Sequence, residues 1–255
     1  MKLVLTPLPD IPLIHTGDNI VTIIWNGLKK ADITLHEGDI LVIAQKIISK
    51  AEDRWTNLAT IQPSKRAVEL AATIEKDPRL VELVLRESRQ VLRTRIGTII
   101  VEHRLGFICA NAGIDHSNVA GAGDSNEEWV LLLPENPDDS AKRIRKSLEA
   151  TIGVHLGVMI IDSHGRAWRQ GVVGVAIGLS GLPGLVDMRG ESDLFGYSLK
   201  ITTIGAADEL AAAASLVMGQ ASEATPIVHV RGFPYPLRDG DIQELLRPKD
   251  QDLFR

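Results

Sequence analysis

Short apolar runs and amphipathic segments follow one another along the chain, which predicts a fold with both strands and helices. Strands are indicated by short, mainly apolar stretches at the first residues before Pro7, and at 40–44, 98–101, 107–110, 154–161 and 227–230. Strands and helices do not alternate strictly. We therefore expect an α+β fold, with a mixed sheet and flanking helices, rather than a doubly wound parallel sheet.

Capping residues mark the ends of the expected helices. Asp77 is suited to an N-cap and Pro78 to the first helical position. Another helix is capped by Asp138 or Asp139 and stopped by Gly153. The expected helices are one after Ser64, one from Pro78, one over 140–152 and one over 206–219, with one or two helical turns at 242–246.

The chain shows no internal repeat and no linker rich enough in Pro, Gly or Ser to divide it. We therefore expect one domain over 1–247, without a secure internal boundary, and a tail over 248–255. The segment 120–128, AGAGDSNEE, predicts a mobile surface loop.

Composition excludes several classes of protein. The 255 residues are 44% hydrophobic and 24% charged, which is too apolar for a disordered chain. The formal charge is −5 and the basic residues are scattered, so nucleic acid is not expected as the main partner. The single cysteine, Cys109, forms no internal disulfide, is most simply a core residue and indicates a reducing compartment.

The apolar stretches are too short for export or membrane insertion. The first residues are shorter than the apolar part of a signal peptide, and 172–186 is interrupted by glycines and falls short of the roughly 20 residues that a membrane helix needs. We therefore expect a soluble, cytoplasmic protein without a membrane partner.

Common phosphate and metal motifs are missing. The sequence has no G-x-x-x-x-G-K-[ST], no G-x-G-x-x-G after a strand and no H-E-x-x-H, and its seven histidines lack metal-ligand spacing. A nucleotide site must therefore be built in another way.

The first polar island is NAGIDHSN, residues 111–118, directly after an apolar run. Asp115 is a hard oxygen donor suited to Mg²⁺ or Mn²⁺, and Asn111 and Asn118 are able to orient a ligand. The alternative is a simple turn, because these residue types favour turns.

The second island is DSHGRAWRQG, residues 162–171, which we place at the end of an apolar strand. It sets the carboxylate of Asp162 beside the hydroxyl of Ser163. From charge and position alone, we expect Arg166 or Arg169 to act in catalysis by clamping a phosphate or a substrate carboxylate. The alternative is a strand-to-loop turn with solvated arginines.

Other features carry less information. The glycine series 171–181 allows close approach to phosphate, but tight packing in a sheet requires glycines as often. Lys46 and Lys50 follow a strand, where lysines are usually solvated. His116 and His164 are more simply surface residues.

Four ordered segments together resemble the coenzyme F420-0:L-glutamate ligase family, the γ-glutamyl ligases that add glutamate to the deazaflavin coenzyme F420. The segments are LVIAQKIISKAE (41–52), ICANAGIDHSN (108–118), DSHGRAWRQGVVGVAIGLSG (162–181) and MGQASEATPIVHVRG (218–232). The likeness extends from Ile11 to Phe233.

The resemblance implies a dimer of an α+β fold that uses GTP and Mg²⁺ or Mn²⁺, with K⁺ as a further candidate ion, to join L-glutamate to the terminal carboxylate of F420-0. Its product is an amide, formed through an acyl phosphate with release of GDP. Carried over by motif, the residues at GTP are Ile11, Pro12, Leu13, Ile14, Gln45, Lys46, Lys50, Asn118, Met218, Gly219, Gln220, Ala221, Ser222, Glu223, Ala224 and Thr225. Those at metal are Asp115, Asp162, Ser163 and Gln220.

One departure from the family pattern bears on the function. Some members have Glu where this chain has Gln220, so the site keeps an oxygen ligand there but loses a charge. Two alternatives stay open beside the ligase: a non-catalytic module that binds a nucleotide or deazaflavin, and a metal-dependent hydrolase of phosphate esters.

Overall fold

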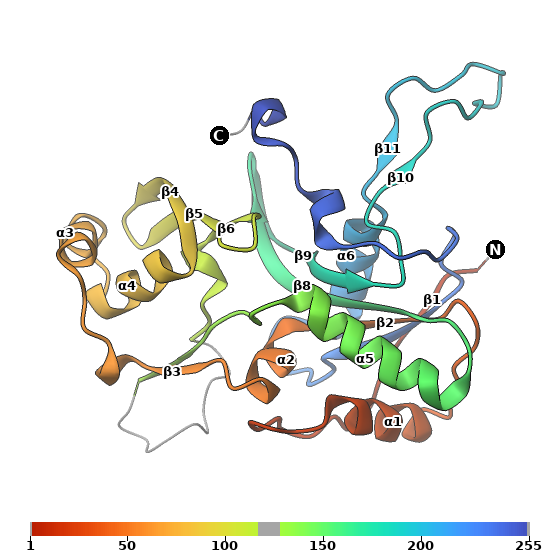
Figure 1. The fold of residues 1–255 in the computed structure, drawn as a ribbon, viewed down its shortest axis with the longest axis horizontal. Coiled ribbons are helices and arrows are strands. Elements are labelled where there is room, and N and C mark those ends of the chain that lie inside the picture. The colour runs from red at the N-terminus through yellow and green to blue at the C-terminus, as the bar shows by residue number, and fades with distance from the viewer. Residues whose placement is uncertain (1, 117–127, 254–255) are drawn as a thin grey trace.

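A mixed sheet of five strands forms the centre of the protein (Figure 1). The computed structural model describes residues 2–116 and 128–253. The strand order is β1-β12-β2-β8-β9, where the strands are β1 (Val4–Pro7), β2 (Ile40–Ala44), β8 (Gly157–Arg166), β9 (Arg169–Ser180) and β12 (Ile227–Arg231). Strands β2 and β8 run parallel, and the other neighbours are antiparallel. The expected α+β fold with a mixed sheet and flanking helices is confirmed.

Helices cover both faces of this sheet, because alternate residues of its central strands are apolar on both sides. Leu41 and Ile43 of β2 belong to one buried cluster, while Ile40 and Val42 belong to the other. Helices α1 (Ile20–Lys30) and α5 (Pro137–Ile152) pack into the first cluster, and α6 (Ala206–Met218) packs into the second.

A smaller lobe lies beside the main sheet, at the left of Figure 1. It consists of a three-stranded sheet, β4 (Ser88–Arg95), β5 (Thr98–His103) and β6 (Ile108–Ala110), with α3 (Lys65–Ile74) and α4 (Pro78–Arg86). Helix α2 (Gln45–Ala51) and the pair β3 (Trp55–Asn57) and β7 (Trp129–Leu131) connect the two parts. Ala67 and Val81 of the lobe share a buried cluster with Leu41 of the main sheet, so one core runs through both.

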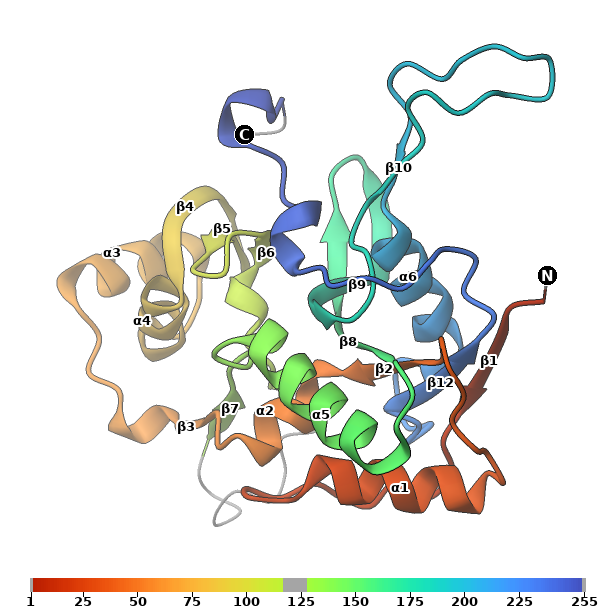
Figure 2. The same ribbon diagram turned by 45° about the vertical axis from the view of Figure 1, so that its right-hand side comes forward.

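An arm extends from the opposite side of the molecule, as Figures 1 and 2 both show. Its base is the short pair β10 (Val186–Asp187) and β11 (Thr203–Ile204), and residues 188–202 form the projecting part. The remaining elements are single 3₁₀ turns at Leu58–Thr60, Asn111–Gly113, Ile242–Leu245 and Lys249–Gln251.

Most helix boundaries follow the capping residues in the sequence. Asp77 caps α4, and Gly153 ends α5 in the left-handed conformation, as expected. The prediction that Asp138 or Asp139 caps α5 is wrong. Asn136 is the N-cap, because its side chain accepts a hydrogen bond from the backbone N–H of Asp139, and Pro137 takes the first helical position.

The island 162–171 is not a strand-to-loop turn. Strand β8 starts at Gly157 and continues through Asp162 to Arg166, paired with β9 over its whole length. The hairpin turns at Ala167 and Trp168. The expected strand 154–161 therefore starts three residues later and extends five residues further, because polar residues on a paired hairpin satisfy their backbone groups as well as apolar ones do.

The glycines of β9 serve tight packing rather than phosphate approach at two positions. A Cβ on Gly174 would lie 2.5 Å from the Cβ of Ser215 and 2.6 Å from the carbonyl oxygen of Ala211 on α6. A Cβ on Gly178 would collide with the backbone of Pro137 at the start of α5. Helices thus approach β9 closely from both faces, which only a residue without a side chain permits.

We expect Gly178→Ala to lower the free energy of unfolding by about 1–3 kcal/mol, because the added methyl overpacks the contact with Pro137. Urea denaturation measures the change. Gly165→Ala is the matched control, since Gly165 lies on the paired strand with no atom within 4 Å of an added Cβ. Equal losses in both variants would contradict the packing explanation.

Two further expectations concern the surface. In the described parts of the chain, 2–116 and 128–253, no helix has the length and apolar character that a membrane crossing requires. The segment 120–128, expected to be a mobile loop, lies outside the described residues apart from Glu128.

Candidate functional site

Asp115 is the centre of a polar cluster at the carboxyl end of β2. Its Oδ2 accepts a hydrogen bond of 2.7 Å from Nε2 of Gln45, and its Oδ1 lies 3.5 Å from Nζ of Lys46. Ser49 donates to Oε1 of Gln45 at 2.8 Å, which fixes the orientation of the amide. The island 111–118 thus brings a carboxylate to α2, beyond forming a turn.

Strand register brings Asp162 to the same edge. Helix α2 begins directly after Ala44, and Ala44 pairs with Ile161 in the parallel ladder. Gln45, the first residue after β2, and Asp162, which lies within β8, therefore follow paired residues of two parallel strands. In open sheets, ligand sites form at such edges.

The charge of Asp162 affects the protonation of Asp115. The pKa of Asp115 is raised to about 6, because burial and the negative charge of Asp162 outweigh the positive charge of Lys46 and the hydrogen bond from Gln45, which lower it. Asp162 is therefore near enough for its charge to act on Asp115, and the expected role of the two carboxylates at a metal stays a prediction. Asp115 thus lies in a largely buried site near a like charge, and both conditions favour its protonated form.

The interaction between Asp115 and Asp162 predicts that a change at one carboxylate shifts the pKa of the other. We expect Asp162→Asn to lower the pKa of Asp115, because the substitution removes a like charge while keeping the shape of the side chain. Carboxyl ¹³C NMR across pH 3–8 follows the titration in the metal-free protein. An unchanged midpoint would show that the two carboxylates do not interact.

His164 is buried, so the expectation that it is a surface residue is wrong. Its Nε2 lies 3.1 Å from Oδ2 of Asp162, and its ring lies 5.3 Å from the ring of Phe107. Residues 162 and 164 are on the same face of β8, so the histidine supports the carboxylate from the side of the lobe. His116, by contrast, is exposed, as expected.

Cys109 lies next to this region but not in its polar part. It is buried in β6, and burial together with the charge of Asp162 raises the pKa of its thiol to about 12. A thiol held neutral in this way is a core residue, as the sequence predicts.

Ser163 and Gln220 form a second polar group on the other face of β8. Ser163 donates to Oε1 of Gln220 at 2.8 Å, and Nε2 of Gln220 donates to Ser215 on α6 at 3.0 Å. Successive residues of a strand point to opposite faces, so Ser163 faces α6 while Asp162 faces the lobe. The four residues expected at metal are thus arranged as two pairs, Asp115 with Asp162 and Ser163 with Gln220.

The loop after α6 directs backbone amides toward one point. The backbone N–H of Ala221 donates to Oε2 of Glu223 at 2.8 Å. Backbone hydrogen bonds, that of Ala221 first, lower the pKa of the Glu223 carboxyl. Gly219 has φ +72°, and a Cβ there would collide with that carboxylate. Residues 219–223 therefore form a concave set of donors of the kind that binds anions.

The other residues expected at GTP are on α2, in the loop 11–14 and in the segment outside the described residues, and their role stays a prediction. Lys50 follows Lys46 by one helical turn on α2, and burial and the charge of Lys46 lower its pKa. Its ammonium lies 5.6 Å from the ring of Trp55. In the loop 11–14, Ile14 is buried and Leu13 is exposed. Asn118 lies outside the described residues.

Arg166 and Arg169 lie at the far end of the hairpin from Asp162. Four residue steps along β8 separate Arg166 from Asp162, which is about 13 Å in an extended strand. Neither arginine forms an ion pair with an acidic residue in the described ranges. The structure therefore does not bring them to the carboxylate pair, and their expected clamping role stays a prediction.

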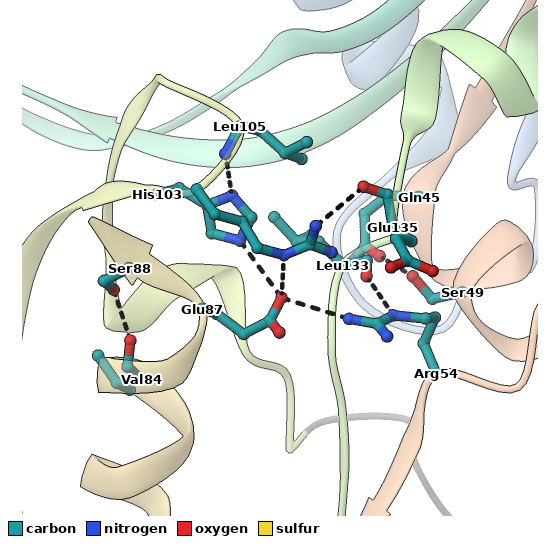
Figure 3. A network of polar contacts seen from close by, with 11 residues as sticks. Gln45, Ser49, Arg54, Val84, Glu87, Ser88, His103, Leu105, Leu133 and Glu135 are labelled. Carbon is teal, nitrogen blue, oxygen red and sulfur yellow. Dashed lines mark hydrogen bonds and ion pairs between the residues drawn. The ribbon is translucent and has the colours of Figure 1, made fainter.

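A buried ionic network, which the sequence does not reveal, supports the segment that pairs with Asp115 (Figure 3). The carboxylate of Glu87 accepts hydrogen bonds from Arg54 at 3.3 Å and Arg104 at 2.9 Å. Arg54 also donates to the carbonyl of Leu133 at 2.8 Å. Two residues earlier, Leu131 exchanges backbone hydrogen bonds with Asp115 in both directions. The network thus fixes the backbone that carries the central carboxylate.

His103 adds to this network as a neutral ring. Burial, and next the positive charge of Arg104, lower its pKa to about 3. Its Nδ1 accepts from the backbone N–H of Leu105, so Nε2 carries the proton and points toward Glu87 at 3.7 Å. No sequence motif marks these residues, since they are distant in the chain and ordinary in type.

The residues fit a divalent cation at the carboxylate pair, although the described residues contain no cluster of three or more His, Cys, Asp or Glu able to hold one. Mg²⁺ is commonly held by one or two carboxylates, with phosphate oxygens and water completing its shell. Asp115 meets this pattern, because burial first, and then the negative charge of Asp162, raise its pKa, and a bound cation would offset both.

Comparison with known proteins identifies relatives over nearly the whole chain. The family model described as F420-0:Gamma-glutamyl ligase matches residues 10–232. A protein of Methanothermobacter thermautotrophicus named coenzyme F420:L-glutamate ligase is 46% identical over 257 residues, covering 100% of both chains. Proteins of the same name from Methanopyrus kandleri (43%, covering 98% of this chain and 96% of the relative) and Archaeoglobus fulgidus (39%, covering 100% and 97%) are also similar.

Proposed function

The chain belongs to the F420-0:gamma-glutamyl ligase family, and from this premise we propose that it joins L-glutamate to coenzyme F420-0 through a γ-glutamyl amide bond in the biosynthesis of coenzyme F420. The observation that carries the proposal is the half-buried carboxylate of Asp115, which lies 3.5 Å from Lys46 on α2 and within the electrostatic influence of Asp162 on β8. A site with paired acids and an adjacent cation suits chemistry on a triphosphate.

The proposed reaction uses GTP to activate a carboxylate. A carboxylate is a poor acylating agent, so the γ-phosphoryl group of GTP is transferred to it first, which forms an acyl phosphate and GDP. The amine of L-glutamate attacks the acyl carbon, an amide forms, and inorganic phosphate leaves with the bonding electron pair. The chain needs no protein nucleophile for either step.

Each part of the site has a task in this proposal. Asp115 and Asp162 hold Mg²⁺ or Mn²⁺, which when bound offsets the charge of the phosphate groups. Gln45 and Lys46 keep Asp115 in place through the contacts described above. The amides of residues 219–223 bind phosphate oxygens, and the carboxylate of Glu223 occupies this position in their absence.

We also propose that the protein acts as a homodimer. The tip of the arm exposes apolar side chains that no part of the described chain covers: Leu194, Phe195 and Ile201 are 97%, 94% and 88% exposed. Apolar side chains gathered on a projecting arm are typical of a contact with another chain. A second copy is the partner that the family resemblance favours.

One assay tests the ligase against its alternatives. The purified protein is incubated with GTP, Mn²⁺, F420-0 and L-glutamate, and the mass of the coenzyme is measured by mass spectrometry. We expect a product heavier by glutamyl units, together with GDP. GDP without that product would indicate a hydrolase, and binding of F420-0 without GDP would indicate a non-catalytic module.

A further inference from the structure

Trp168, at the turn of the β8–β9 hairpin, combines two features that are unfavourable for the free protein. Its side chain is 88% exposed, although tryptophan is one of the most apolar residues. Its φ is +63°, in the left-handed region that hairpin turns normally fill with Asn or Gly. Residues held in such conformations are concentrated at ligand sites, so the turn is a candidate for binding.

The surroundings of Trp168 are open and positively charged. Added Cβ atoms on Gly165 and Gly171, on the two sides of the turn, would meet no atom within 4 Å. Arg166 and Arg169 flank the turn without an acidic partner in the described chain. Arg169 is exposed, whereas Arg166 is half-buried and its Nη1 is buried there without a hydrogen-bond partner. The end of the hairpin thus carries an exposed aromatic side chain next to the exposed Arg169, with the half-buried Arg166 on the other side of the turn.

The hairpin also connects this surface to the carboxylate pair. Asp162 lies at its inner end, and about 13 Å of extended strand separates it from Arg166. A ligand that spans the hairpin would place one end at the carboxylates and the other at Trp168. The end of this ligand near Trp168 should be flat and aromatic, and the part of the ligand that passes the arginines should be anionic.

We propose that Trp168 stacks on the deazaflavin ring of the coenzyme substrate, while Arg166 and Arg169 attract its anionic side chain. The inference rests on the proposed function, because it takes its ligand from that reaction. In F420-0 the ring and the reacting carboxylate are at opposite ends of the molecule, which matches the separation of Trp168 from Asp162. Trp168 is therefore a specificity residue that selects a ring far from the bond being formed.

Steady-state kinetics test the proposal. We expect Trp168→Ala to raise KM for F420-0 by about 10-fold or more, since stacking of a planar base on an aromatic side chain has effects of this size. KM for GTP and for L-glutamate should not change. Trp168→Phe should recover most of the loss, because it keeps an aromatic face. An unchanged KM for F420-0 in Trp168→Ala overturns the proposal.

Ile96→Ala is the matched control. Ile96 lies at the turn of the other hairpin, between β4 and β5, is 68% exposed and follows Arg95. It has no aromatic ring and is on a different sheet from Asp162. We expect this variant to keep KM for all three substrates at the wild-type value. A rise equal to that of Trp168→Ala would overturn the assignment to stacking.

Binding measurements separate this proposal from the ligase activity. Fluorescence titration with F420-0, and with the deazaflavin ring bearing a neutral side chain, gives Kd without turnover. Trp168→Ala should raise Kd for both ligands. The double variant Arg166→Ala with Arg169→Ala should raise Kd for F420-0 only. If the wild type binds in this pattern but forms no product, the ligase proposal fails and the stacking proposal stands.

The oligomeric state provides the last test. If size-exclusion chromatography shows that Trp168→Ala dissociates the protein while KM for F420-0 of the remaining oligomer is unchanged, the tryptophan is a contact between copies and the proposal is wrong. If the elution volume is unchanged and KM for F420-0 rises, the proposal is supported.

Discussion

Asp115→Asn is expected to lower kcat/KM for ligation by about 10²–10³-fold, a loss of the size seen when one preorganised electrostatic group is removed from a reaction centre. The carboxylate stands between Lys46 and Asp162 and is the group best placed to hold a divalent cation. The amide keeps an oxygen that is able to accept the hydrogen bond from Gln45, so the loss should come from charge rather than from a collapsed site.

The same variant should be more stable than the wild type at neutral pH. The pKa of Asp115 rises from its ordinary value near 4 to about 6 in the folded protein. A raised carboxyl pKa favours the folded state below the unfolded pKa, and this contribution is lost as the pH rises through the folded pKa. Near pH 7.5 the charged form therefore costs up to about 3 kcal/mol in the metal-free protein, which the amide avoids.

Two measurements check this pair of expectations. Coupled assay of GDP release with product mass gives the activity, and urea denaturation at pH 5 and pH 7.5 without metal gives the stability. Asp32→Asn is the control, because Asp32 is exposed and has a positive φ, +54°, that Asn tolerates. An active Asp115→Asn, or one less stable at pH 7.5 than the wild type, would remove this carboxylate from the proposed mechanism.

A loss of activity combined with a gain in stability would mean that Asp115 is kept for function and not for folding. Residues of this kind do not follow the apolar periodicity that predicts strands and helices. Apolar patterns predict strand β2 and its end at Ala44, and capping residues predict α3 and α4, because these signals are local. The functional residues violate the local pattern, since they place charge where burial disfavours it. In the sequence these residues can be recognised as polar segments between apolar runs, but the pattern alone does not show what they bind.

What could not be predicted depends on pairing between distant residues. The island 162–166 has the composition of a turn, and only its partner strand β9 makes it a strand. The same pairing decides that Asp162 faces the lobe while Ser163 faces Gln220. Likewise, His164 packs against Phe107, which directly precedes β6 of the lobe. One sequence without its contacts contains none of this information.

Asp39→Asn is expected to have the largest effect on stability. The carboxylate is 1% exposed and accepts hydrogen bonds from Nε2 of His229 at 2.8 Å, from Arg231 at 2.6 and 2.9 Å, and from the backbone N–H of His36 at 2.9 Å. These contacts join the start of β2 to β12. Removing one member of a fully buried ion pair costs about 3–5 kcal/mol, and we expect the lower end of this range because His229 is buried but the Arg231 side chain is 41% exposed.

The pH dependence identifies the cause of that loss. Burial alone would raise the pKa of Asp39, but the hydrogen bonds from Arg231 and His229 outweigh it and hold this pKa well below its usual range. A lowered carboxyl pKa stabilises the fold above the unfolded value near 4, and the contribution is lost as the pH falls through the folded value. The gap in stability between wild type and Asp39→Asn should therefore be widest at neutral pH and narrow on acidification below pH 4.

Thermal denaturation at pH 7 should show a drop in Tm of about 10 °C, since 1 kcal/mol corresponds to about 2–4 °C in a protein of this size. Asp10→Asn is the matched control, because the ion pair of Asp10 with Lys30 is exposed and contributes at most about 1 kcal/mol. Equal Tm values for the two variants would mean that the contacts of Asp39 do not hold β12 to β2. A large loss confined to Asp39→Asn, with the ligase activity of the surviving fold intact, would separate the groups that maintain the main sheet from those that act at its edge.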